Sequence, residues 1–166
     1  IHKLKMNIDY KHYLNSMNAF FEWIEKKKQL EVVIAAHPIS NYAEGDFNGR
    51  KIIKWHTCEL TLDAAFVINQ TSNSTSFAVL ANKPIIFITC DDVEKCRYMS
   101  RYISTLSGYL GKNKYNIDHD AFEDIDISPV EQQKRMNYIY SFLTDKTTEN
   151  KTNGEIFTEY VKSHIG

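Results

Sequence analysis

Residues 65–88, AFVINQTSNSTSFAVLANKPIIFI, contain the pattern that decides the fold of this chain. Ala65–Ile68 and Pro84–Ile88 are continuous apolar runs without polar alternation, which is typical of strands covered on both faces of a parallel sheet. Pro84 fits the first residue of its strand, where no ladder donor is needed. Between the runs lie a polar turn, Thr71–Thr75, and a short helix with an apolar face formed by Phe77, Leu80 and Ala81. We therefore predict a strand–helix–strand unit.

The same alternation extends towards the N-terminus. Val32–Ala36 is an apolar run that His37 and Pro38 end, and Lys51–Trp55 is a second, weaker strand. Thr57 can cap a short helix that runs to about Ala64. A longer helix precedes these strands, because apolar residues recur at helical spacing at Tyr10, Tyr13, Leu14, Met17, Phe20, Phe21 and Ile24, with Lys26, Lys27 and Lys28 in the last turn. The alternation predicts a Rossmann-like α/β domain with a short parallel sheet and right-handed crossovers.

The C-terminal part is predicted to be a helical tail. Val93–Leu110 carries one apolar stripe, and Gly111 can end that helix. Ser128–Glu131 and Thr152–Glu155 are capping boxes, each of which predicts the start of a further helix. An acidic connector precedes the first box, and Tyr115–Ile117 can form a short strand within it.

The composition of the chain limits the classes of function that we expect. The 166 residues suit a single domain, and the net charge of −1 argues against a nucleic-acid partner. No apolar run reaches the roughly 20 residues of a transmembrane segment. The three cysteines form no CxxC pair, so we expect no metal site and no disulfide framework, and nothing indicates a bound cofactor. The chain begins without Met or a signal peptide, and we expect a fragment of a longer protein in a reducing cytoplasm.

Ligands of parallel α/β sheets bind beyond the carboxyl ends of the strands. That rule selects the loops 37–49, 56–59 and 70–76. The last of these joins a strand to a helix and supplies five hydroxyl groups, which suits a phosphate at a helix start. Its candidate binding residues are Ser72, Asn73, Ser74, Thr75 and Ser76. The alternative is that these side chains only cap the helix.

Four further residues are candidates for the same site. His37 follows the first strand directly and can donate to a phosphate or transfer a proton, although it can also simply pack on Pro38. Thr57 follows the second strand. Glu59 can accept a hydrogen bond from a sugar hydroxyl or stabilise its own helix, and Arg50 can pair with a phosphate or lie at the surface.

Residues 32–89 resemble the C-terminal half of a GT-B glycosyltransferase. The matching segments are Ala36-His37-Pro38, Phe47-Asn48-Gly49-Arg50, Thr57-Cys58-Glu59-Leu60, Ala65–Ile68, the serine-rich turn, and Phe77–Ile88. This order is similar to bacterial capsule and surface-polysaccharide transferases, and to glycerophosphotransferases of the teichoic-acid type. Nucleotide-sugar 2-epimerases share the architecture, but their glycine-rich turn and its glutamate are missing here.

The resemblance implies a domain that binds a nucleotide-activated sugar or a related donor. His37 is then the catalytic residue, and the serine-rich turn binds the diphosphate. The acceptor and the general base belong to an N-terminal domain of the parent protein, through which the domain can associate with the inner face of the membrane. The alternative from a different class is a non-catalytic module of the same architecture that binds an anion or a protein.

Overall fold

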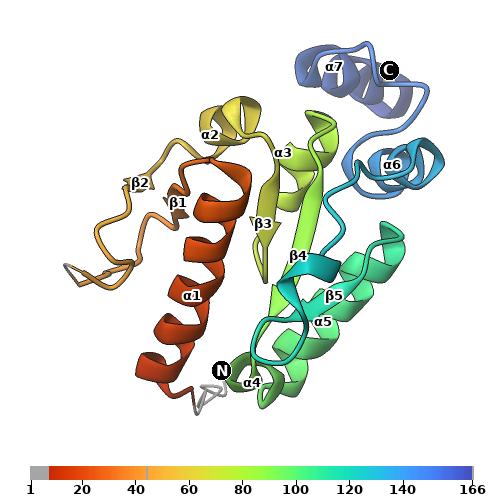
Figure 1. The fold of residues 1–166 in the computed structure, drawn as a ribbon. Helices are drawn as coiled ribbons and strands as arrows, with labels where there is room; N and C mark the ends of the chain where they lie inside the picture. Colours follow the sequence, from red (N-terminus) through yellow and green to blue (C-terminus); the bar gives the residue numbers. More distant parts are fainter. Residues whose placement is uncertain (1–7, 44, 166) are drawn as a thin grey trace.

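The computed structural model describes residues 8–43 and 45–165 (Figure 1). Within them strands and helices alternate, which confirms the α/β fold class. The strands are β1 (Ile34–Ala36), β2 (Ile52–Lys54), β3 (Val67–Asn69), β4 (Ile85–Thr89) and β5 (Lys114–Asn116). The α-helices are α1 (Tyr10–Lys28), α2 (Thr57–Asp63), α3 (Thr75–Leu80), α4 (Asp91–Glu94), α5 (Arg97–Tyr109), α6 (Gln132–Tyr138) and α7 (Asn153–Ile165). A 3-10 helix, η1 (Phe122–Asp124), and a π-helix, η2 (Ile139–Leu143), complete the described elements.

The strands form two parallel sheets instead of the one predicted. One sheet is the pair β1-β2, in which Ile34 faces Ile52, and the other has the order β3-β4-β5. Every pairing is parallel, as the apolar runs predicted. Since β1 and β3 are not hydrogen-bonded to each other, each has one edge without a strand partner among the residues that the structure describes. A cavity lies between these two edges.

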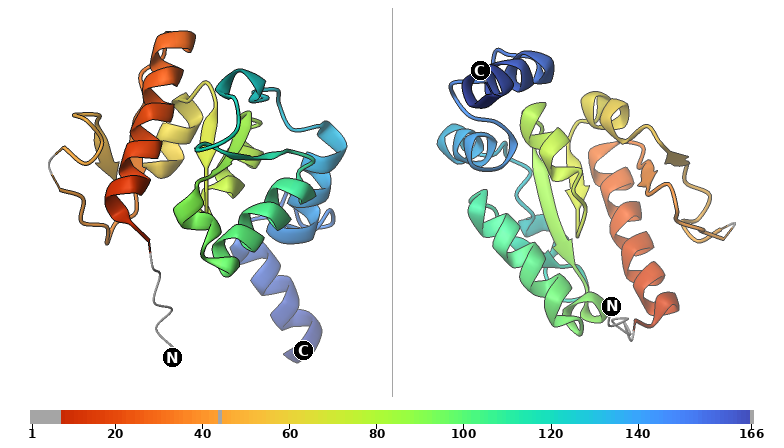
Figure 2. Two further views of the ribbon diagram at one scale, coloured as in Figure 1. Left: turned by 60° about the horizontal axis from the view of Figure 1, so that its bottom comes forward. Right: turned by 180° about the vertical axis from the view of Figure 1, so that it is seen from behind.

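Strand β4 is the centre of the core. All five of its residues are buried, and it lies between β3 and β5. Phe20 and Ile24 of α1, Val79 of α3 and Ile103 of α5 belong to the same buried cluster. Figure 2 shows α1 and α5 on either side of this strand. Strand β4 therefore has no solvated face, which explains the absence of polar alternation in its sequence.

The start and the end of helix α1 are fixed by residues close to them in the sequence. The Asp9 side chain accepts a hydrogen bond from the His12 N–H at the start of the helix. Lysines occupy the last turn, where cations interact favourably with the helix dipole. The helix ends at Gln29, which adopts the left-handed conformation with a φ of 55°. The prediction for this helix is confirmed.

Two predictions for the C-terminal part are wrong. The expected helix over 93–110 is divided into α4 and α5, because Cys96 has an extended backbone conformation. Ser128 does not cap a helix either, since α6 begins only at Gln132. Instead the nearly buried Lys112 ammonium donates hydrogen bonds to Ser128 and Asp126, which holds the connector against the domain. The hydrogen bonds of the nearly buried Lys112 thus take the place of the helix cap that the local sequence predicted for Ser128.

The second capping box is confirmed. The Glu155 carboxylate accepts a hydrogen bond from the Thr152 N–H, and Thr152 Oγ1 accepts one from the Glu155 N–H. Helix α7 follows and lies at the margin of the molecule, with Phe157 and Tyr160 exposed (Figures 1 and 2). No helix within 8–43 and 45–165 has both the length and the apolar character that a bilayer crossing requires.

Candidate functional site

A cavity of about 500 Å³ separates the facing edges of β1 and β3. Its volume falls in the range of sites that enclose a small ligand. Val33–Ala35 line it from the side of β1, and Phe66–Ile68 line it from the side of β3. Ala35 is exposed although it lies in the middle of β1, so solvent reaches this part of the strand. The gap in the sheet and the cavity are therefore the same feature.

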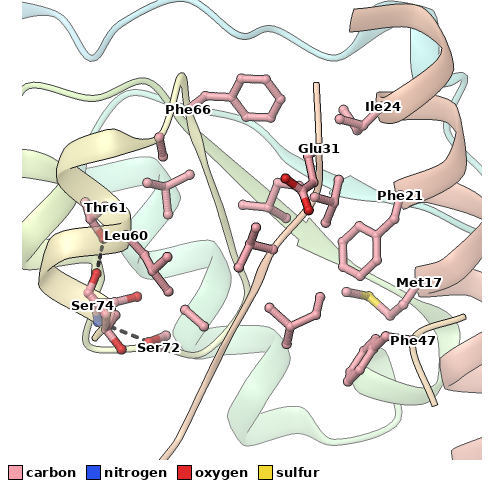
Figure 3. A pocket seen from close by; sticks show the side chains of 18 of the residues that line it. Met17, Phe21, Ile24, Glu31, Phe47, Leu60, Thr61, Phe66, Ser72 and Ser74 are labelled. Atoms are coloured by element: carbon pink, nitrogen blue, oxygen red, sulfur yellow. Dashed lines mark hydrogen bonds between the residues drawn. The ribbon is translucent and has the colours of Figure 1, made fainter. Parts of the chain in front are cut away.

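Two helices supply the walls of the cavity. Met17, Phe21 and Ile24 extend from α1 on one side (Figure 3). Leu60 and Thr61 of α2 lie on the opposite side, together with Ser72 and Ser74. The side chains Met17, Phe21 and Ile24 of the first wall are apolar, whereas the second wall ends in hydroxyl groups. The cavity is therefore apolar over most of its length and polar at one end.

The polar end of the cavity lies beyond the carboxyl ends of β1 and β3. Thr57, Ser72 and Ser74 line this end, so the structure brings together three of the predicted binding residues. Gln70 joins them and accepts a hydrogen bond of 3.1 Å from the Tyr13 hydroxyl. Burial raises the pKa of that phenol, so Tyr13 remains a neutral donor. This end offers hydroxyl and amide groups to a ligand.

A buried side chain shapes the serine-rich turn. Asn69 is 2 % exposed, and its side-chain amide donates to Thr75 Oγ1 and to the Ser72 carbonyl. Asn69 Oδ1 in turn accepts from the Ser72 N–H, and Ser72 Oγ accepts from the Ser74 N–H. Most polar backbone groups of the turn are thereby satisfied internally. Its side-chain hydroxyls, rather than its N–H groups, are what it can offer to a ligand.

Two predicted residues lie away from the cavity lining. His37 is exposed, and its Nδ1 accepts a hydrogen bond of 3.3 Å from the Ile39 N–H. Arg50 is only 9 % exposed and donates to both carboxylate oxygens of Glu25, to Asn18 and to the Phe47 carbonyl. The guanidinium holds the pKa of Glu25 below its usual range. Arg50 therefore anchors the loop before β2 to α1.

The remaining predicted residues have other contacts. Glu59 is exposed, and its carboxylate lies 3.7 Å from His56 Nδ1. Asn73 accepts from the Tyr102 hydroxyl, and Ser76 shares a hydrogen bond of 3.1 Å with the Tyr138 hydroxyl. Thr75 is 1 % exposed and donates to the Ser72 carbonyl. None of these four side chains lines the cavity.

The charges around the cavity are few and negative. Glu31 and Asp63 are its only charged lining residues in the described part of the chain, and both lie near the amino ends of β1 and β3. No lysine, arginine or histidine within 8–43 and 45–165 is part of the lining. The same ranges contain no group of three or more His, Cys, Asp or Glu side chains that suits a metal ion. The described lining therefore offers an anionic ligand hydrogen bonds and apolar contact, but no cation to pair with.

Several lining residues are not among the sequence-based candidates. Met17 and Phe21 belong to the apolar stripe of α1, and Phe66 belongs to the apolar run of β3. Each pattern predicts core packing, and only the separation of β1 from β3 leaves these side chains facing a cavity. Gln70 follows a predicted strand directly, and that position is the one signal that could have included it.

Comparison of the chain with models of known protein families, with curated proteins and with solved structures found no match.

Proposed function

We propose that this domain binds the nucleotide-activated donor of a glycosyl or phosphoglycosyl transferase of surface-polysaccharide biosynthesis. One observation supports it most directly: Thr57, Ser72 and Ser74 meet at the polar end of one cavity, beyond the carboxyl ends of β1 and β3. That is the place where ligands bind in parallel α/β sheets. The resemblance over residues 32–89 supplies the donor class.

The three hydroxyl groups are the proposed contacts of the donor diphosphate. Hydrogen bonds from fixed donors stabilise the negative charge that develops on a leaving phosphate. The buried Asn69 network keeps Ser72 and Ser74 in place before a ligand arrives, so little ordering is needed on binding. His37 remains the proposed catalytic residue of the resemblance. The acceptor and the general base are assigned to a second domain of the parent protein.

Titration with a panel of nucleotides tests the proposal. We expect one nucleoside diphosphate to bind, and Thr57→Ala and Ser74→Ala to weaken its binding about tenfold or more each, because a hydrogen bond to a charged group contributes about 1.5–3 kcal/mol. Ser104→Ala, on the exposed side of α5, is the matched control and leaves affinity unchanged. Isothermal calorimetry gives the affinities. Failure of every nucleotide to bind the unmodified chain rules out donor binding.

A non-catalytic binding module is the second candidate. The specific observation in its favour is the absence of cationic side chains from the described cavity lining. A diphosphate carries several negative charges, and most sites for it include an arginine or a lysine. This candidate predicts that the isolated chain binds none of the nucleotides and still has a ligand for the apolar part of the cavity.

A further inference from the structure

The donor proposal uses only the polar end of the cavity and leaves its apolar length unexplained. Within the described residues, that length is bounded by two strand edges with no strand partner, because β1 pairs there only with β2 and β3 only with β4. Edges of this kind present a row of backbone donors and acceptors to whatever lies beside them. Here both rows border one cavity.

The direction of the backbone groups follows from the bonds that are made. The Ile34 N–H donates to Lys51 beside β2, and the Val67 N–H donates to Pro84 beside β4. Since backbone groups alternate in direction along a strand, the N–H groups of Val33 and Ala35 point away from β2. In the same way the N–H groups of Phe66 and Ile68 point away from β4. Both sets are thus directed to the cavity side.

We propose that the cavity between β1 and β3 binds a short extended peptide, which adds one strand to both sheets at once and joins them. The peptide carries β-branched apolar residues with a basic residue at one end. Main-chain hydrogen bonds to the two edges hold it, as in other cases of recognition by strand addition. This inference goes beyond donor binding and does not depend on it.

The chemistry of the peptide follows from the lining. A strand in this position has the apolar α1 side chains Met17, Phe21 and Ile24 on one side and Leu60 on the other. Strands covered on both faces are apolar throughout, and β-branched residues suit them best. Asp63 lies at the end of the cavity where β1 and β3 begin, and no cation lines the described cavity. Glu31 at the same end already pairs with Lys51 at 2.9 Å, so Asp63 is the carboxylate left for a ligand. A basic residue at that end of the peptide therefore meets complementary charge.

Synthetic peptides added to the whole chain test the inference. The probe is acetyl-Arg-Val-Ile-Val-amide, and two matched controls are the same peptide N-methylated at the isoleucine and a version with Glu in place of Arg. We expect the probe to bind and N-methylation to weaken it about tenfold or more, because one edge loses its main-chain bond and the added methyl group prevents close approach. The Glu version binds more weakly than the probe, and Asp63→Asn reduces the difference between the two.

Hydrogen exchange identifies where the peptide binds. On saturation with the probe we expect slower exchange at the N–H groups of Val33, Ala35, Phe66 and Ile68, and no change at the buried strand β4. Ser104→Ala, which lies outside the cavity lining, leaves probe binding unchanged. Peptides and nucleotides are titrated in separate experiments, so a failure of nucleotide binding and a failure of peptide binding are read separately. The inference is overturned if the probe does not bind, if the N-methylated peptide binds equally well, or if the four amides of the free chain already exchange as slowly as those of β4. The last result means that β1 and β3 pair directly in solution.

Discussion

The turn between β3 and α3 contains hydroxyl groups of two kinds, which a pair of single substitutions separates. Thr75 is buried and hydrogen-bonded to Asn69 and Ser72, whereas Ser74 lines the cavity. We expect Thr75→Ala to lower the free energy of unfolding by about 1–3 kcal/mol, because the Asn69 amide loses a buried partner. Ser74→Ala changes it much less. Chemical denaturation of both variants measures the difference.

The control for this pair is Thr75→Ser, which keeps the hydroxyl group and removes only a methyl group. It restores most of the lost stability if the hydrogen bond is the cause. Equal stability of Thr75→Ala and the unmodified chain contradicts the structural role that the geometry gives to Thr75. At this scale the sequence predicted the polar turn correctly, but it could not separate the inward hydroxyl of Thr75 from that of Ser74. Adjacent residues of one turn differ only in the direction of their side chains.

Helix α1 is joined to α4 by one buried carboxylate. The Asp92 side chain is fully buried and accepts hydrogen bonds from the Asp9 N–H, from Lys95 Nζ at 2.8 Å and from His12 Nδ1 at 2.6 Å. The contacts with Lys95 and His12 lower the pKa of Asp92 to about 2, and the contact with Asp92 raises the pKa of His12. The docking of the first helix is therefore linked to pH.

We expect His12→Ala to destabilise the chain more in mildly acidic than in alkaline solution. The pKa of His12 is higher in the folded chain than in the unfolded chain, where it is about 6.5. The stability that His12 contributes is therefore fully present below about pH 6.5 and is lost as the pH rises through the folded-state pKa. Thermal unfolding at about pH 5.5 and about pH 9 measures this, with His56→Ala, an exposed histidine of another loop, as the control. A loss of stability that is the same at both pH values argues against the ion pair.

The contribution of Asp92 has the opposite dependence. Its pKa is lowered on folding, so its stabilising effect is present above the ordinary value near 3.8 and declines as the pH falls towards about 2. At the scale of elements, the sequence predicted α1 itself from its apolar stripe and its terminal lysines. It could not predict the contact with α4, because His12 and Asp92 are 80 residues apart and no pattern in either segment indicates that the two lie close together.

The two sheets differ in burial, and we expect them to differ in the free energy of local opening as well. All residues of β4 are buried, whereas Ile52 of β2 and Ala35 of β1 are exposed. We expect the amides of β4 to exchange only by global unfolding, and the amides that join β1 to β2 to exchange through a smaller opening. Native-state hydrogen exchange at increasing denaturant measures both. Identical opening free energies in the two sheets contradict this division.

The sequence by itself determined the type and order of the elements from α1 to β4. Apolar runs without alternation gave the parallel strands, and the helical spacing from Tyr10 to Ile24 gave α1, because these periodicities follow from the geometry of each element alone. Only the tertiary structure decided that β1 and β3 stand apart, that Arg50 is bound to Glu25, and that Thr57 meets Ser72 and Ser74. Each of these depends on the distance between segments remote in the chain. Apolar residues that line a cavity have the same periodicity as those that fill a core, and the pattern along the chain cannot distinguish the two.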